Sequence, residues 1–166
     1  STDRYTLNLP DGSRERFSAV IMATTGARTA EIVKGLNSQL SNELSGIRFA
    51  SSALVITGHR LADIQNPLRA FGLVIPHLER RKILAVSFSS RKFPDRAPGD
   101  RVLLRTFVGG ALQPELFELP EDQMIATVRG ELAETLGVRG EPDFVRVFRY
   151  ANAMPQYHVG HLDRVA

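Results

Sequence analysis

Short apolar runs separated by turn residues are the feature that most limits what this chain can fold into. Runs of this length, rich in Val, Ile, Phe and Tyr, are typical of strands, and most neighbouring runs are joined by connections too short for a crossover helix. The runs are Tyr5–Leu9, Phe17–Ala23, Ser52–Gly58, Phe71–Pro76, Lys82–Ser90, Arg101–Gly110 and Asp143–Tyr150. The first two flank Asp11-Gly12 and predict a β-hairpin whose second strand is buried. Together the runs predict a mixed, largely antiparallel sheet.

Two segments change period and predict helices packed on this sheet. In the first, Ile32, Val33, Leu36, Leu40, Leu44 and Ile47 recur at helical spacing, which predicts one helix capped near Gly46. The second follows Pro120, carries acids in its first turn and ends at Gly137. Its apolar stripe is Met124, Ile125, Val128, Leu132 and Leu136. This order of elements predicts an α+β fold with the helices on one face of the sheet.

The composition is typical of one folded domain, which we expect to cover residues 1–166. Hydrophobic residues make up 43% of the chain and charged residues 23%, which argues against disorder. Cysteine is absent, so disulfides and thiolate metal sites are excluded. No apolar run is long enough to cross a bilayer, and the polar opening residues do not predict a signal peptide. The cytoplasm is therefore the expected compartment.

The residues alone do not predict a self-contained catalytic site. The sequence has no G-x-G-x-x-G, no P-loop and no G-x-S-x-G. His158 and His161 are two candidate ligands without an obvious third, so no metal site is predicted. The net charge is +3, but the basic residues are spread along the chain, and no nucleic-acid partner is expected.

Three stretches nevertheless resemble one family of flavoenzymes. They are "FGLVIP…KILAVSFSSRKFPDRAPGDRVLLRTFVGG", "FVRVFRYANAMPQYHVGHLDR" and "ERFSAVIMATTG". Their order and spacing resemble the substrate-binding domain of the oxygen-dependent protoporphyrinogen and coproporphyrinogen III oxidases. Members of that family carry FAD and convert a porphyrinogen, a reduced tetrapyrrole, to the porphyrin in haem biosynthesis. The resemblance implies hydride removal by the flavin and its reoxidation by oxygen.

The same resemblance implies that the chain is an internal part of a longer enzyme. The family's dinucleotide-binding fingerprint and its C-terminal glycine-rich segment are not found in these residues. The chain alone is therefore expected to be inactive and not to bind FAD tightly. Oligomeric state, attachment of the parent enzyme to a membrane surface, and preference between the two porphyrinogens stay open.

Site residues follow from the resemblance, position by position. The expected substrate-binding residues are Phe71, Gly72, Val74, Ser87 and Phe107. Ser87 replaces a larger apolar residue common in the family, and Phe107 offers a ring for stacking on a flat macrocycle. Val20 and Tyr150 are expected to contact the cofactor, and no catalytic residue is assigned. Apart from the resemblance, Val20, Val74 and Phe107 would be interpreted as core.

The turn "SSRKFPDRAP" is expected to be structural. Phe93 would tuck this turn under the sheet, and Ser89 and Ser90 would bond its backbone. Two other hypotheses stay open at this point. One is a related flavin amine oxidase or desaturase, and the other is a stand-alone α+β module that binds an acidic partner without catalysis.

Overall fold

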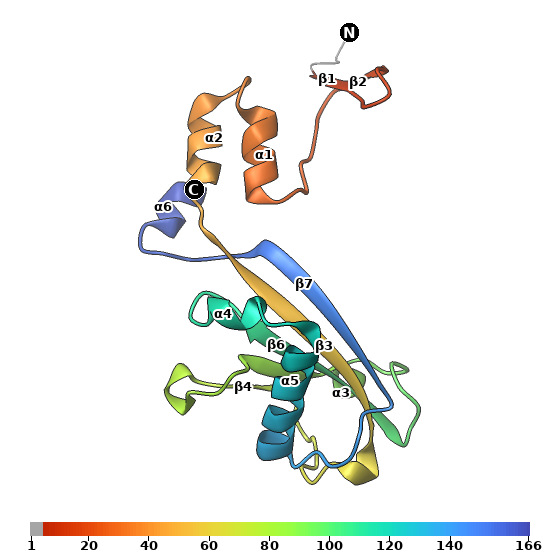
Figure 1. Ribbon diagram of the computed structural model, residues 1–166. Helices are drawn as coiled ribbons and strands as arrows, with labels where there is room; N and C mark the ends of the chain where they lie inside the picture. The colour runs from red at the N-terminus through yellow and green to blue at the C-terminus, as the bar shows by residue number, and fades with distance from the viewer. Residues whose placement is uncertain (1–4) are drawn as a thin grey trace. The chain divides into compact units, whose positions relative to one another are not determined.

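The structure of the protein is a computed structural model that describes residues 5–166 (Figure 1). Its internal contacts divide the chain into two compact units. The larger unit is Arg48–His158, and the smaller unit joins the chain up to Ile47 with Val159–Ala166. The expectation of one domain over residues 1–166 stays a prediction. No helix among the described residues is both long and apolar enough to span a bilayer.

The larger unit is built on a five-stranded antiparallel sheet with the order β4-β5-β6-β3-β7. Its strands are β3 (Phe49–Arg60), β4 (Gly72–Val74), β5 (Ala85–Phe88), β6 (Arg101–Gly109) and β7 (Phe144–Pro155). The predicted α+β fold with a largely antiparallel sheet is confirmed. The long strands β3 and β7 extend beyond the predicted runs, since they pair with each other from Phe49 and Pro155 to Gly58 and Phe144.

One face of the sheet is closed by α5 (Glu121–Leu136). Side chains alternate across a strand, so every second residue of β3 and β6 points to this helix. Val55 and Leu104 on the sheet and Leu132 on the helix belong to one core cluster and are essentially inaccessible. Burying one such side chain stabilises the fold by roughly 1.5–3 kcal/mol. The predicted limits of the helix are confirmed, and Gly137 ends it with a φ of 65°.

Short helical turns complete the larger unit. They are η1 (Leu61–Asp63), η2 (His77–Glu79), α3 (Ser89–Lys92) and α4 (Pro114–Phe117). The α3 turn connects β5 to β6. The Ser90 hydroxyl accepts a hydrogen bond from the Leu103 amide of β6 at 3.1 Å, whereas the prediction was a bond to the backbone of the turn itself. The prediction for Phe93 is wrong, because its side chain is 47% exposed. Lys92 and Arg96 lie over its ring at 5.4 and 5.9 Å, so cations rather than the sheet cover it.

The smaller unit contains the predicted hairpin, but its second strand is shorter and lies earlier in the chain than expected. Strands β1 (Tyr5–Asn8) and β2 (Arg14–Phe17) pair antiparallel. The chain then leaves the hairpin, so the predicted buried strand Phe17–Ala23 is wrong. Residues 18–24 pair with no strand of the described chain, and Ile21 is 95% exposed. An apolar run needs a neighbouring strand before it can become part of a sheet.

The predicted single helix is two helices, α1 (Gly26–Val33) and α2 (Ser38–Ser45). Gly35 lies between them, and glycine is a poor residue for a helix interior. Asn37 then caps α2, because its side-chain oxygen accepts a hydrogen bond from the Leu40 amide at 3.0 Å. The predicted end near Gly46 is confirmed. A short helix, α6 (His161–Val165), joins this unit, and Arg164 donates to the Glu43 carboxylate at 3.1 Å.

Candidate functional site: the open face of the sheet

The sheet face opposite α5 carries two adjacent rows of side chains that run across all five strands. The register of the strands defines both rows. The apolar row consists of Val74, Ala85, Phe107, Leu54 and Phe148. The arginine row consists of Gly72, Ser87, Arg105, Ile56 and Arg146. We call this surface the open face, and its residues come from segments far apart in the sequence.

A hollow of about 210 Å³ lies on the open face, over β4, β5 and β6. Its lining includes all the predicted substrate-binding residues, Phe71, Gly72, Val74, Ser87 and Phe107, together with Leu73, Ala85 and Val86. Phe71 and Val74 are largely exposed, at 67% and 82%. The volume is below the range of about 300–1,000 Å³ typical of enclosed ligand pockets. The hollow is therefore a shallow, open depression rather than an enclosed cavity.

Glycine at position 72 brings two backbones unusually close at the floor of the hollow. A Cβ atom built there would lie 2.4 Å from the carbonyl oxygen of Val86. Gly72 pairs with Ser87 in the sheet. Beside this pair, the Phe88 amide donates a hydrogen bond to the carbonyl oxygen of Phe71 at 2.9 Å. Only a residue without a side chain permits this approach.

The open face is positively charged where the arginine row crosses it. The Arg105 guanidinium lies 5.8 Å from the centre of the Phe107 ring, which joins the two rows. Neither row contains an acidic residue. Arg101, farther along β6, differs because Asp143 pairs with it at 3.3 Å.

The two residues expected to contact the cofactor lie in different units of the chain. Tyr150, on β7, is 46% exposed, lies opposite Ser52 and belongs to the open face. Val20 is half-buried and lies in the extended segment after β2. Each of these two residues is therefore described only within its own unit.

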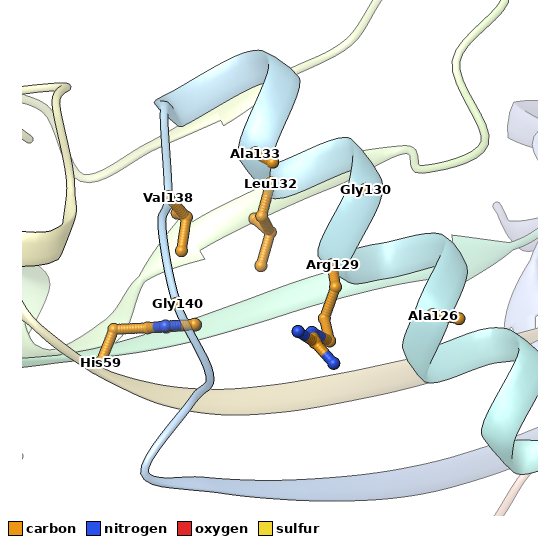
Figure 2. Close-up of a pocket in the computed structure, with 8 residues that line it drawn as sticks. All are labelled: His59, Ala126, Arg129, Gly130, Leu132, Ala133, Val138 and Gly140. Carbon is orange, nitrogen blue, oxygen red and sulfur yellow. The ribbon is translucent and has the colours of Figure 1, made fainter.

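A second and larger cavity, of about 420 Å³, lies on the other side of the sheet. Figure 2 shows it between α5, which carries Arg129, and the chain that follows this helix, which carries Val138 and Gly140. His59 of β3 also lines it, but the ring is only 2% exposed, and neither nitrogen has a partner among the described residues. A ligand in this cavity therefore does not reach the imidazole nitrogens.

Burial lowers the pKa of His59, and Arg129 acts in the same direction. The carboxylates of Asp143 and Asp63 oppose this change. The imidazole is therefore neutral and belongs to the core, so the open face is the better candidate site. Among residues 5–166, no group of three or more histidines and acids is arranged to hold a metal ion.

Sequence reasoning missed six residues of the two rows: Leu54, Ile56, Ala85, Arg105, Arg146 and Phe148. Their strands were predicted, but which residues lie side by side depends on strand order. Alternation within β6 puts Arg105 and Phe107 on the same face, and this signal was available in the sequence. By contrast, no signal in the sequence indicated that Phe107 pairs with Leu54 on β3.

Comparison with known proteins identifies the family. A model of the flavin-containing amine oxidoreductases matches residues 1–165. The chain belongs to this family. A mitochondrial protoporphyrinogen oxidase of Nicotiana tabacum is 34% identical over 152 residues, which are 89% of this chain and 30% of that protein. A coproporphyrinogen III oxidase of Bacillus subtilis is 30% identical over 163 residues, 97% of this chain and 34% of that protein. The chain thus spans about a third of the length of these relatives.

Solved structures of flavin amine oxidoreductase-like proteins share the fold. A protein of Exiguobacterium sp. 255-15, provisionally named a protoporphyrinogen oxidase, aligns with a TM-score of 0.73 and 25% identity, over 99% of this chain and 35% of its own. A reduced UDP-galactopyranose mutase aligns with a TM-score of 0.72 over 96% of this chain and 34% of its own. Its 14% identity supports likeness of fold alone.

Proposed function

We propose that this chain is the substrate-binding part of a longer FAD-dependent oxidase that converts a porphyrinogen to the porphyrin. Residues 1–166 would act together as this part of the enzyme, in the cytoplasm, with attachment to a membrane surface left open. The observation that carries the proposal is the hollow on the open face, whose lining holds all five residues expected from the family motifs. The names of the similar proteins, which are protoporphyrinogen and coproporphyrinogen oxidases, support the same substrate class.

In this proposal the open face holds one side of the tetrapyrrole. Phe107 and Val74 contact the apolar pyrrole edges, and Gly72 lets the macrocycle approach the backbone. The apolar row also keeps water from that side of the ring. The large exposed fractions of Phe71 and Val74 favour a surface that is covered when substrate binds.

The residues present fit only part of an FAD site. Tyr150 offers a half-exposed aromatic ring on the open face, and Val20 offers a half-buried aliphatic side chain. The sequence has no G-x-G-x-x-G turn for the cofactor's pyrophosphate. We propose that both residues touch FAD in the longer enzyme, where FAD supplies the hydride acceptor, and that this chain alone binds FAD weakly.

Phe107→Ala in the longer oxidase tests the proposal. We expect a rise of roughly 3- to 10-fold in KM for the porphyrinogen, because stacking contributes about 0.5–1.5 kcal/mol beyond the area it buries. Steady-state kinetics measure the change, and thermal unfolding checks that the variant is folded. Phe93→Ala is the matched control, since Phe93 is also a partly exposed phenylalanine of this unit but does not line the hollow.

Equal KM values for the folded Phe107→Ala variant and the wild type would contradict a role of the hollow in substrate binding. A longer enzyme that oxidises amines and leaves porphyrinogens unchanged would favour a related amine oxidase. A chain that binds acidic partners but no tetrapyrrole would favour the binding module.

A further inference from the structure

We infer that Arg105, together with Arg146, binds the acidic side groups of the tetrapyrrole and so contributes to substrate specificity. This inference rests on the proposed function and assigns a residue for the carboxylates that porphyrinogens carry at the edge of the ring. The first observation is position. Arg105 follows Ser87 in the arginine row, and Ser87 lines the hollow.

The second observation is that these two arginines lack acidic partners. Neither Arg105 nor Arg146 forms an ion pair with any residue in the described part of the chain. By contrast, Arg101 on the same strand is paired with Asp143. Arg146 donates one hydrogen bond to the carbonyl oxygen of Val145 at 2.8 Å. A guanidinium group that faces no acid on its own surface can bind an anion through its remaining N–H groups, and its planar fork suits a carboxylate.

The third observation is the arrangement of the rows. Ile56 separates Arg105 from Arg146, so the two Cα atoms lie two strand spacings apart, or roughly 10 Å. Phe107 and Phe148 lie beside them in the apolar row. A cationic row next to an aromatic row complements a molecule with an apolar ring and carboxylates along its edge. That description fits a porphyrinogen better than an amine, which arginines would repel.

A methyl ester of the porphyrin separates binding of the carboxylates by the arginine row from binding of the ring by the apolar row. We use coproporphyrin III, which has four carboxylates and is fluorescent, and its tetramethyl ester, both in the same detergent. The longer oxidase is titrated as wild type and as Arg105→Gln, Arg105→Lys and Arg146→Gln. Arg139→Gln is the matched control, because Arg139 is an exposed arginine outside the open face.

Arg105→Gln is expected to weaken binding of the free acid about 10-fold, since a hydrogen bond to a charged group is lost. Binding of the ester should change less than about 2-fold, because the ester presents no charge to Arg105. Arg105→Lys should retain part of the affinity, and Arg146→Gln should show a smaller loss of the same kind. Arg139→Gln should match the wild type with both ligands.

The failure of this inference and that of the proposed function give different results. A wild-type longer oxidase that binds neither porphyrin overturns the proposed function, and the inference falls with it. A wild-type longer oxidase that binds both porphyrins, with Arg105→Gln unchanged toward the acid, overturns the inference alone. Equal weakening of acid and ester by Arg105→Gln also overturns it, because Arg105 would then act only by supporting the Phe107 ring. Circular dichroism of each variant verifies that the chain is folded.

Discussion

His59 is a buried imidazole whose protonation opposes folding. Burial lowers its pKa in the folded chain, whereas the unfolded chain has the ordinary value of about 6.5. Between these two values the unfolded state binds the extra proton, so the free energy of unfolding falls as the pH drops through about 6.5. Above that value this contribution to stability is fully present.

We therefore expect His59→Leu to reduce the loss of stability between about pH 7 and pH 5. The slope removed is at most about 1.4 kcal/mol per pH unit, the limit for one proton. Urea unfolding at a series of pH values measures it. His77→Leu serves as the control, because His77 is an exposed histidine on η2 of the same unit. Identical slopes for His59→Leu and the wild type would show that His59 does not gain a proton on unfolding.

Gly72→Ala is expected to destabilise the larger unit. The new Cβ would lie 2.4 Å from the Val86 carbonyl oxygen, so the β4–β5 pair must move apart. Forcing extra atoms into a packed site costs about 1–3 kcal/mol. Urea unfolding compares this variant with Gly99→Ala, whose Cβ meets nothing within 4 Å. A Gly72→Ala chain as stable as Gly99→Ala would contradict the close approach of these strands.

Among the elements, α5 was the easiest to predict from the sequence. Its caps, its first-turn acids and its apolar stripe all indicate the same helix, and packing agrees with them. By contrast, the single helix predicted over Ile32–Ile47 is divided, since Gly35 and the Asn37 cap favour a break that the apolar spacing did not reveal. Periodicity identifies a buried face, but local capping decides where a helix ends.

Leu132→Ala tests how much α5 contributes to the larger unit. Leu132 is fully buried against the sheet, and its truncation should lower the free energy of unfolding by about 2–5 kcal/mol. Glu134→Ala is the control on the same helix, since Glu134 is 67% exposed and its ion pair with Arg81 is expected to contribute less than about 1 kcal/mol. Similar losses for both variants, measured by urea unfolding, would mean that the α5 stripe is not the core.

At the scale of the whole molecule, hydrogen bonding predicts which segments exchange slowest. Strand β3 lies between β6 and β7, so both of its edges are paired. Residues 18–24 have no backbone acceptor for their amides in the described chain. Amide hydrogen exchange followed by mass spectrometry should therefore show strong protection for β3 and little for residues 18–24. If residues 18–24 were protected as strongly as β3, the result would contradict the unpaired segment and support the strand predicted there.

The sequence by itself determined the types of most elements, the buried stripe of α5 and, through family motifs, the residues that line the hollow. These properties depend on local periodicity, caps and motif spacing, which are readable along the chain. Only the tertiary structure decided that Phe107 lies beside Leu54, that Arg105 lacks an acidic partner, and that residues 18–24 stay unpaired. The physical reason is that register and strand order join residues distant in sequence, and no local pattern encodes which strands become neighbours.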